Sequence, residues 1–433
     1  MKIVTAQEFK GKLLNQVLNR GKADMSTVQS SVRKIVNDVQ EQGDKALLWY
    51  TEKFDKASLT ASKLKVDERE IKEAYKKLEK IQIAALRKAA DNIASFHRKQ
   101  LRAKWTLQIA EGVTLGQVTR PLASVGVYVP GGKAVYPSSV LMSAVPAKVA
   151  GVEEVIVCSP PGTDGDVNAA LLVAADIAGV SAVYRVGGAQ AIAAMAYGTE
   201  TVQKADKIVG PGNVYVTAAK LEVSRDVAID VPAGPSEVLV IADETGNASF
   251  IASDLLAQAE HDPQAWAILV TTSEALASSV KKEVYRQVKN LSRTEIINSS
   301  LQKRGLIVTV NSIQEAIEYS NMIAPEHLQI QTENPAEVLS KIRNAGAVFL
   351  GGYSPVAFGD YSSGLNHVLP TAGYAKIYSG LSSLDFVKTM NFLECSKKGY
   401  GRLKETAVTI AEMEGFDAHA KSVAIRGDEN SED

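Results

Sequence analysis

The fold is decided by the stretch Val125-Gly126-Val127-Tyr128-Val129-Pro130-Gly131-Gly132. Its first five residues form a β-type run, and the Pro-Gly-Gly that follows is typical of a turn. A helical pattern over residues 138–150 comes next, followed by the apolar run Val155-Ile156-Val157. A strand, turn, helix and strand in this order predict parallel strands connected by helices, and therefore an α/β fold.

The same alternation continues toward the C-terminus. Further helices are predicted over residues 167–177 and 189–196, and further strands over residues 182–186, 207–209 and 227–229. The pattern restarts after Pro232-Ala233-Gly234-Pro235, with strands predicted over residues 237–241, 265–270, 306–310 and 347–350. We therefore expect two Rossmann-like parallel-sheet units in tandem, divided near this segment.

Other kinds of segment flank the α/β pattern. Residues 25–101 are rich in Lys, Glu and Ala with apolar residues at helical spacing, which predicts a helical N-terminal region. Residues 105–110 and 113–118 are typical of the two strands of a β-hairpin. After Ser379 the pattern is helical again, so we expect a helical C-terminal tail with a frayed, charged end over residues 427–433.

The bulk composition narrows the class of protein. A chain of 433 residues with 45% hydrophobic and 22% charged residues is an ordinary globular protein of two or more domains. Its 48 Lys and Arg residues nearly balance 49 Asp and Glu residues, which argues against a general surface for nucleic acid. The first residues are unlike a signal peptide, and no apolar run is long enough to span a bilayer. Because the cysteines are Cys158 and Cys395 alone, we expect no disulfide framework and predict a cytoplasmic protein.

Gln258 and His261 lie in the segment Ala257-Gln258-Ala259-Glu260-His261-Asp262-Pro263, which closes an amphipathic helical run beginning at Ser249. Because they are three residues apart, a helix would project both side chains from one face, until Pro263 discourages its continuation. The pair can be two metal ligands, or it can be a polar helix terminus with a capping histidine. The local sequence allows both interpretations.

Glycine-rich turns follow three of the predicted strands: Gly131-Gly132, Gly187-Gly188-Ala189-Gln190 and Gly210-Pro211-Gly212-Asn213. Parallel sheets bind ligands at the carboxyl ends of their strands, so these turns can form a nucleotide site. None of them matches the G-x-G-x-x-G fingerprint, and tight turns need glycine without any ligand. A nucleotide site and a purely structural role therefore remain equally good explanations.

Glu326 and His327 place a carboxylate beside an imidazole in Ala324-Pro325-Glu326-His327-Leu328. Adjacent strand residues point to opposite sides, so we expect the pair to lie on a loop if both side chains serve one site. Together they are suited to activating water and moving protons near neutral pH. An exposed polar turn is the alternative.

Two further histidines lie near glycines. Asp360 and His367 belong to the polar loop over residues 359–367, and His419 follows Gly415, a natural helix C-cap. A histidine in the latter position is usually a surface residue. Taken with Gln258 and His261, however, Asp360 and His419 complete a nitrogen and oxygen donor set of the type that zinc accepts.

Eight motifs, in their order along the chain, resemble bacterial histidinol dehydrogenase. The resemblance runs from about residue 20 to Ala418-His419-Ala420 and Arg426, and the motifs are Tyr128-Val129-Pro130-Gly131-Gly132, Gly187-Gly188-Ala189-Gln190-Ala191, Gly210-Pro211-Gly212-Asn213, Gly234-Pro235-Ser236-Glu237, Ala257-Gln258-Ala259-Glu260-His261-Asp262, Pro325-Glu326-His327-Leu328, Gly359-Asp360-Tyr361 and Asn366-His367-Val368-Leu369-Pro370-Thr371. That family oxidises L-histidinol to L-histidine, the last steps of histidine biosynthesis, through an enzyme-bound aldehyde with two NAD⁺.

The resemblance also implies roles for individual residues. Glu326 and His327 would be catalytic, and one Zn²⁺ per subunit would be bound by Gln258, His261, Asp360 and His419, the last from the partner of a homodimer. The family's NAD positions match Tyr128, Gln190 and Asn213. Its substrate positions match Ser236, Gln258, His261, His327, Asp360, His367, Glu414 and His419.

The resemblance gives the domain prediction as well. We expect an N-terminal arm over residues 1–22, a main α/β domain over 23–122 and 235–378 that carries the catalytic pair with Gln258, His261 and Asp360, an inserted Rossmann-like NAD-binding domain over 123–234, and a helical tail over 379–433 that reaches the partner subunit. Two positions depart from the family pattern, in which a proline is usual where Leu365 stands and an acidic residue where Gln329 stands.

Three rival interpretations follow from the same residues. A paralogue could use the zinc and NAD site on another small amino or hydroxy alcohol, although Glu414 and His419 favour histidinol. A zinc hydrolase could use Glu326 as its base without a nucleotide, although Gln190 and Asn213 count against it. A non-catalytic dimeric scaffold would leave the Glu326-His327 pair unexplained.

Overall fold

The computed structural model describes residues 1–21, 26–131, 135–231 and 234–427. Gly132, Pro232, Ala233 and most of the predicted frayed end therefore lie outside the described residues. The chain forms two compact units, one of Met1–Gln100 with Leu122–Phe386 and one of Leu101–Pro121 with Val387–Asp433. Among the described helices, none is long and apolar enough to cross a membrane.

The first unit contains a five-stranded parallel sheet in the order β6-β5-β4-β7-β8. Its strands are β4 (Ser124–Tyr128), β5 (Glu154–Ser159), β6 (Ala182–Arg185), β7 (Lys207–Val209) and β8 (Ala228–Ile229). The helices between them are α8 (Pro137–Ala150), α9 (Ala169–Ile177), α10 (Gly188–Tyr197) and α11 (Val214–Val223). The predicted alternation of strand and helix is therefore confirmed in this segment. Both neighbours of β4 in the sheet, β5 and β7, come later in the chain, so the strand order runs in opposite directions on either side of β4. Sheets of this kind bind ligands at such a point, here between β4 and β7.

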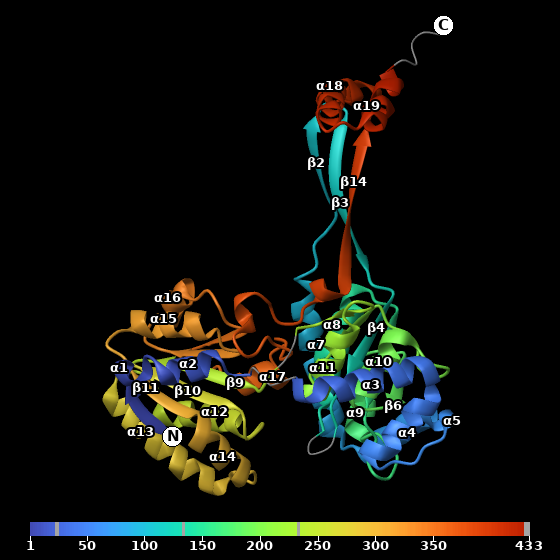
Figure 1. Ribbon diagram of the computed structural model, residues 1–433. Coiled ribbons are helices and arrows are strands. Elements are labelled where there is room, and N and C mark those ends of the chain that lie inside the picture. The colour runs from blue at the N-terminus through green and yellow to red at the C-terminus, as the bar shows by residue number, and fades with distance from the viewer. Residues whose placement is uncertain (22–25, 132–134, 232–233, 428–433) are drawn as a thin grey trace. The chain divides into compact units, whose positions relative to one another are not determined.

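A six-stranded parallel sheet has the order β1-β11-β10-β9-β12-β13. It is formed by β1 (Lys2–Thr5), β9 (Glu237–Ala242), β10 (Trp266–Thr271), β11 (Gly305–Thr309), β12 (His327–Gln331) and β13 (Ala347–Leu350). Figure 1 shows α15 (Ile313–Ile323) and α16 (Pro335–Lys341) on one face and α13 (Glu274–Gln287) and α14 (Thr294–Arg304) on the other. The remaining elements of this part are α1 (Ala6–Phe9), α2 (Lys12–Leu18), α12 (Ala248–Ala259), η1 (Val288–Asn290), α17 (Val356–Tyr361) and η2 (Tyr374–Lys376). The short η3 (Ser383–Phe386) instead places Phe386 in a core of the five-stranded sheet.

Both sheets are buried on two faces because alternate side chains enter different cores. In β9, Val238 and Val240 join the cluster that contains α12, whereas Leu239 and Ile241 join the cluster that contains α15. These four side chains are at most 1% exposed. Continuous apolar runs of this kind are what a parallel sheet covered by helices requires.

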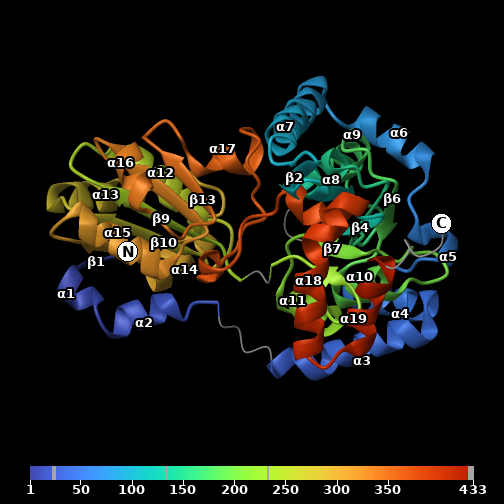
Figure 2. The ribbon, with the colours of Figure 1, turned by 90° about the horizontal axis from the view of Figure 1, so that it is seen from above.

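The domain prediction was wrong for the N-terminal helices. We expected residues 23–122 to share a core with residues 235–378, but α3 (Ser26–Gln42) and α4 (Asp44–Asp55) pack in one core with α10 and α11. The helices α6 (Glu68–Lys77) and α7 (Lys80–Arg98) join α8 and α9 on the other face of the five-stranded sheet, as Figure 2 shows. The short α5 (Ala61–Leu64) places Leu64 in the first of these cores. The cause is the apolar stripe of α3, which has its complement on α10 and α11.

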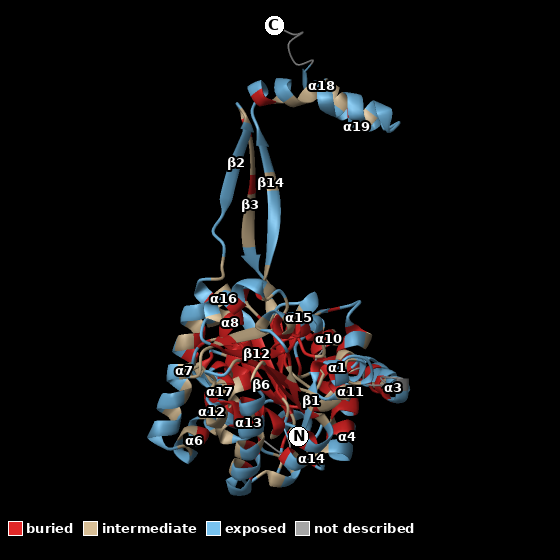
Figure 3. Ribbon diagram, turned by 90° about the vertical axis from the view of Figure 1, so that its left-hand side faces the viewer, coloured by how far each residue is buried: buried red, intermediate tan, exposed pale blue. Residues whose placement is uncertain are grey.

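The second unit is an antiparallel sheet with helices. It contains β2 (Trp105–Ala110), β3 (Val113–Pro121) and β14 (Val387–Cys395), in the order β14-β3-β2, with α18 (Lys397–Met413), α19 (Asp417–Ala424) and η4 (Ile425–Gly427). The predicted hairpin is confirmed. The expectation of a helical tail over residues 379–433 is confirmed for α18 and α19 but was wrong for Val387–Cys395, which pairs with β3 as a strand. Figure 3 shows that this unit is mainly exposed in the single chain.

A core substitution tests the placement of the N-terminal helices. Leu47 of α4 is fully buried against the five-stranded sheet. We expect Leu47→Ala to lower the free energy of unfolding by about 2–5 kcal/mol, because it leaves a cavity. Urea denaturation followed by circular dichroism measures the loss. The exposed Glu52 of the same helix is the control, and Glu52→Ala should change the value by less than about 0.5 kcal/mol. Equal effects would contradict this packing.

Candidate active site

A cleft of about 1520 Å³ lies in the first unit and receives residues from the loops of both sheets. The turn Gly210-Pro211-Gly212-Asn213 contributes from the five-stranded sheet, whereas Glu326, His327 and Asp360 contribute from the six-stranded sheet. Residues predicted from separate motifs in the two halves of the chain therefore face one cavity, although Tyr128, Gln190 and Gln258 are not among the residues that line it. Concave sites with a few convergent polar groups are typical of enzymes.

Glu326 and His327 lie at the amino end of β12. The expectation that both lie on a loop was wrong in part, because His327 is the first residue of the strand. The two side chains nevertheless meet, with Glu326 Oε2 3.7 Å from His327 Nδ1. This is possible because Glu326 precedes the strand and escapes its alternation. Both residues are buried.

The hydrogen bonds of His327 define its neutral form. Nδ1 lies 3.1 Å from the backbone carbonyl of Glu237, and a carbonyl only accepts, so Nδ1 carries the proton. Nε2 has no hydrogen-bond partner among the described residues and lies 3.7 Å from Asp360 Oδ1. Burial lowers the pKa of His327 to about 3. The imidazole is therefore neutral at neutral pH, with a free lone pair on Nε2.

The carboxyl groups near His327 are perturbed in the opposite sense. Burial raises the pKa of Glu326 well above its ordinary value, although the backbone N–H of Glu237, which donates to Oε2 over 2.9 Å, opposes the shift. Burial also raises the pKa of Asp360 to about 7. A carboxylate whose pKa is raised accepts a proton more readily than an ordinary one, which suits a general base.

The spacing of Gln258 and His261 predicted that both lie on one helix, but only Gln258 does. The helix α12 ends at Ala259, Glu260 is its C-cap, and His261 follows in a turn with its N–H bonded to the carbonyl of Gln258 over 3.3 Å. Gln258 is buried and its Nε2 atom has no partner among the described residues. His261 lines the cleft.

His367 is held at the wall of the cleft. Its Nδ1 lies 3.1 Å from the carbonyl of Asp360 and its Nε2 lies 3.2 Å from Ser139 Oγ. Burial lowers the pKa of His367 to about 4. Ser236, immediately before β9, also lines the cleft. Four predicted substrate residues, His261, Asp360, His367 and Ser236, thus share one cavity with His327.

Gln258, also a predicted substrate residue, is not among the residues that line the cleft. The remaining two predicted substrate residues belong to the second unit. Glu414 is the C-cap of α18 and His419 lies in α19, and both are exposed in the single chain. Of the four residues expected to be zinc ligands, His261 and Asp360 line the cleft, Gln258 is buried outside its lining, and His419 lies in the second unit. Within the described ranges, no group of three or more His, Cys, Asp or Glu side chains forms a metal site.

The residues matched to NAD positions lie at the carboxyl edge of the five-stranded sheet. Tyr128 ends β4, and its hydroxyl accepts the backbone N–H of Gly188 over 3.2 Å. Gln190, in the first turn of α10, is buried with both amide atoms unpartnered in the described part of the chain. Asn213 caps α11, its Oδ1 accepting the N–H groups of Tyr215 and Val216.

The chain is similar to known proteins over nearly all of its length. A family model described as histidinol dehydrogenase matches residues 18–427. The histidinol dehydrogenase of Methanothermobacter thermautotrophicus is 51% identical over 97% of this chain and 98% of that protein, and the one of Bacillus thuringiensis is 48% identical over 98% of each. The crystal structure of histidinol dehydrogenase from Elizabethkingia anophelis matches with a TM-score of 0.94 and 41% identity, covering 99% of this chain and 98% of that one.

The chain belongs to the histidinol dehydrogenase family. It is therefore an NAD-dependent oxidoreductase of histidine biosynthesis. The family resemblance expected from the motifs is confirmed.

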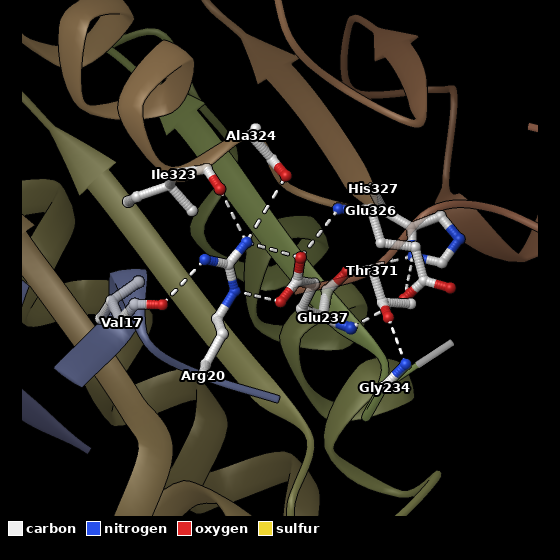
Figure 4. Close-up of polar contacts among 9 residues, drawn as sticks. All are labelled: Val17, Arg20, Gly234, Glu237, Ile323, Ala324, Glu326, His327 and Thr371. Atoms are coloured by element: carbon white, nitrogen blue, oxygen red, sulfur yellow. Dashed lines mark hydrogen bonds and ion pairs between the residues drawn. The ribbon is translucent and has the colours of Figure 1, made fainter. Parts of the chain in front are cut away.

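Sequence reasoning missed the polar contacts that Glu237 makes with Glu326, His327 and Arg20. Figure 4 shows Arg20 and Glu237 side by side, with Glu237 also bonded to Glu326 and His327. Glu237 belongs to the motif Gly234-Pro235-Ser236-Glu237, but the sequence assigned it no role. Arg20 lies where the resemblance to histidinol dehydrogenase begins. Their separation of 217 positions left no local signal for the pair.

The surroundings of Gln329 explain why an amide stands there in place of the acidic residue usual in histidinol dehydrogenases. Its Nε2 atom donates to Asp254 Oδ2 over 2.7 Å in a fully buried contact. Burial raises the pKa of Asp254 to about 6. An acidic residue at 329 would face this carboxyl without a donor, whereas the amide supplies one. The structure gives no comparable reason for Leu365, which packs on the core near Phe349.

Asp254 makes stability depend on pH. The pKa of this carboxyl group rises from 3.8 to about 6 on folding, so its ionisation destabilises the native state as pH rises through that interval. Asp254→Asn keeps an acceptor and removes the ionisation. We expect the free energy of unfolding of the variant, relative to the natural protein, to rise by roughly 2–3 kcal/mol between pH 4 and pH 8. Urea denaturation at both pH values measures it, and a difference independent of pH would contradict the assignment.

Proposed function

We propose that this protein oxidises L-histidinol to L-histidine with two NAD⁺ and one Zn²⁺ per subunit, in active sites shared by a homodimer. The observation that carries the proposal is the buried Glu326–His327 pair, in which Nε2 of His327 has no hydrogen-bond partner among the described residues and lies 3.7 Å from Asp360 Oδ1. Family membership supplies the reaction, and these groups supply a proton acceptor at each position where the reaction needs one.

His327 serves as the base in the first oxidation. Its free Nε2 takes the hydroxyl proton of the alcohol while a hydride leaves the same carbon for NAD⁺, which yields the aldehyde and NADH. The proton on Nδ1 stays bonded to the carbonyl of Glu237, so the ring keeps its orientation throughout. His327 then releases the acquired proton before the second oxidation.

Glu326 serves as the base for water in the second oxidation. It takes a proton from water as the water oxygen bonds to the aldehyde carbon, and its raised pKa makes it a better proton acceptor than an ordinary carboxylate. The remaining hydroxyl proton of the hydrate passes to His327 as the second hydride leaves for the second NAD⁺. The sum is one alcohol, one water and two NAD⁺ giving one carboxylate, two NADH and three protons.

The donor set of the first unit fits a zinc ion. The buried amide nitrogen of Gln258 has no partner within the described part of the chain, so rotation of the amide group would present its oxygen to a metal ion without the loss of a hydrogen bond. Asp360 is a mostly buried carboxylate whose raised pKa shows the cost of burying it without a cation. We assign Gln258, His261, Asp360 and His419 of the partner subunit as ligands. When bound, the ion would anchor the substrate and act as a Lewis acid.

The five-stranded sheet fits NAD⁺. Gln190 has two amide atoms without a partner among the described residues, so they are available to a ligand. Gly210 lies where any side chain would collide with the carbonyl of Tyr128, so the turn after β7 packs closely on β4. Buried Lys220 donates to Asp230 Oδ1 over 2.6 Å, and Asp230 Oδ2 accepts the N–H of Gly210 over 2.7 Å. The turn is thus fixed before the cofactor arrives.

The second unit fits a dimer interface. Its buried hydrophobic side chains, within the residues that the structure describes, are Val113 and Ala420. Large apolar side chains are exposed on both its sheet and its helices: Trp105, Leu107, Ile109, Met390, Leu393, Ile410, Met413, Phe416 and Ile425. Exposed apolar groups in such number mark a surface that another chain covers. Glu414 and His419 lie among them and would reach the partner's substrate site.

The stoichiometry of NADH tests the reaction. With L-histidinol limiting, absorbance at the NADH band should reach two equivalents of NADH per histidinol, because the alcohol and aldehyde steps share one site. Chelation should abolish activity and added zinc should restore it, since the metal anchors the substrate. One NADH per substrate, or full activity in metal-free enzyme, would contradict the proposal.

Mixed dimers test the shared site. His419→Ala and Glu326→Ala should each be nearly inactive alone, because each variant homodimer lacks one group in both sites. A mixed dimer contains one site with both natural residues, so an equal, randomly reassorted mixture should recover about a quarter of the natural activity. Mass spectrometry of the intact complex verifies that mixed dimers form. If they form without activity, each site is built within one chain.

A further inference from the structure

Glu237 contacts both members of the catalytic pair from the first position of β9. Its N–H donates to Glu326 Oε2 over 2.9 Å, and its own Oε1 accepts the N–H of Glu326 over 3.2 Å. Its carbonyl accepts the Nδ1 proton of His327 over 3.1 Å. The tautomer of His327 thus depends on the backbone of Glu237, whereas the main chain of Glu326 depends on the Glu237 side chain.

Arg20 fixes the Glu237 carboxylate in turn. Its Nε and Nη2 atoms donate to the two carboxylate oxygens, Nη2 at 2.6 Å from Oε1. The guanidinium also donates to the carbonyls of Val17 and Ile323, over 2.8 Å each. The side chains of Arg20 and Glu237 are only 2% and 3% exposed. A forked, fully bonded and desolvated pair has one geometry, which a lysine in place of the arginine cannot reproduce.

We propose that Arg20 and Glu237 are positioning residues for Glu326 in the second oxidation. The guanidinium orients the Glu237 carboxylate, and that carboxylate holds the main chain of Glu326 so that its side chain faces the attacking water. Arg20 also neutralises Glu237, which would otherwise repel the Glu326 carboxylate. The inference rests on the proposed role of Glu326. His327 and the first oxidation are left out of it, because a backbone carbonyl fixes the imidazole.

Single-turnover kinetics of Arg20→Lys separate positioning from a general structural role. We expect the first NADH to form at nearly the natural rate and the second about 100-fold more slowly, because small displacements of a catalytic group cost about this much in rate. The steady-state kcat falls accordingly while KM for histidinol changes by less than about threefold. Glu237→Asp keeps the charge but withdraws the carboxylate from Glu326, so it should behave alike and carries the test if Arg20→Lys does not fold.

Arg185→Lys is the matched control. Arg185 is also buried, with a side chain 3% exposed, and it donates to Glu70 and to the carbonyls of Lys63 and Lys65. Its substitution likewise removes a buried guanidinium that pairs with a carboxylate and two backbone carbonyls, but from a place outside the cleft. Thermal denaturation should show a comparable loss of stability for both arginine variants, whereas kcat of Arg185→Lys should stay within about twofold of the natural value.

A double-mutant cycle completes the test. In a Glu326→Gln background, Arg20→Lys should lower kcat by less than about threefold, because the group that Arg20 positions is already absent. Equal losses in both backgrounds would overturn the proposal, and so would equal slowing of the two NADH steps or an unchanged kcat in folded Arg20→Lys and Glu237→Asp. An unchanged kcat in Glu326→Gln alone would contradict the proposed role of Glu326 instead, so the two failures are distinguishable.

Discussion

The buried ion pair between Arg20 and Glu237 is the constraint on which the floor of the cleft depends. Two charges withdrawn from water are tolerated only when their hydrogen bonds are made, and here the guanidinium has the carboxylate and two backbone carbonyls as acceptors. Loss of either partner would leave the other charge unpaired beside Glu326. The pair also ties three distant segments together, the end of α2, the start of β9 and the end of α15. A site assembled from such segments is rigid only if these ends cannot move independently.

The two sheets contribute opposite edges to the cleft. The five-stranded sheet presents the turns that follow β4 and β7, the edge at which parallel sheets ordinarily bind ligands. The six-stranded sheet presents the amino ends of β9 and β12. At that edge the backbone N–H of Glu237, the first residue of β9, donates to the carboxylate of Glu326. The backbone of Glu237 therefore offers both a donor for Glu326 and an acceptor for His327. Helix N-termini at the carboxyl edge of a sheet would offer backbone donors but no such acceptor.

The regular part of the fold was predictable because the patterns that indicate it are local in the sequence. Strand periodicity and glycine turns lie within a few residues of one another, so the alternation from residue 125 onward and the hairpin over 105–118 were found from sequence. The strand at Val387–Cys395 was not, because its partner β3 lies more than 260 positions earlier in the chain. The helices over 26–98 were recognised as helices, but an amphipathic stripe does not name the sheet that it covers.

The candidate site was predictable only as far as its motifs reached. Glu326, His327, Asp360 and His367 were chosen from short polar motifs and a family resemblance, and the structure brings them to one cavity. Arg20 belongs to no recognisable motif. Glu237 is the first residue of an apolar strand, a position where a charged residue usually marks only the end of the strand. Their importance arises from desolvation and long-range pairing, which a linear pattern does not encode. The tautomer of His327 likewise depends on a carbonyl 90 positions away.

The second unit shows why one histidine supports two interpretations. His419 lies beyond a glycine cap and is exposed in the single chain, as a surface residue would be. The unit around it, however, buries few apolar side chains within its described residues and exposes many, which an independent domain of this size could not sustain. Covering those side chains with a second copy would remove apolar surface from water. The same contact would bury the exposed imidazole of His419 and bring it to the partner's proposed zinc site. Dimer formation would then both stabilise the second unit and complete the metal site.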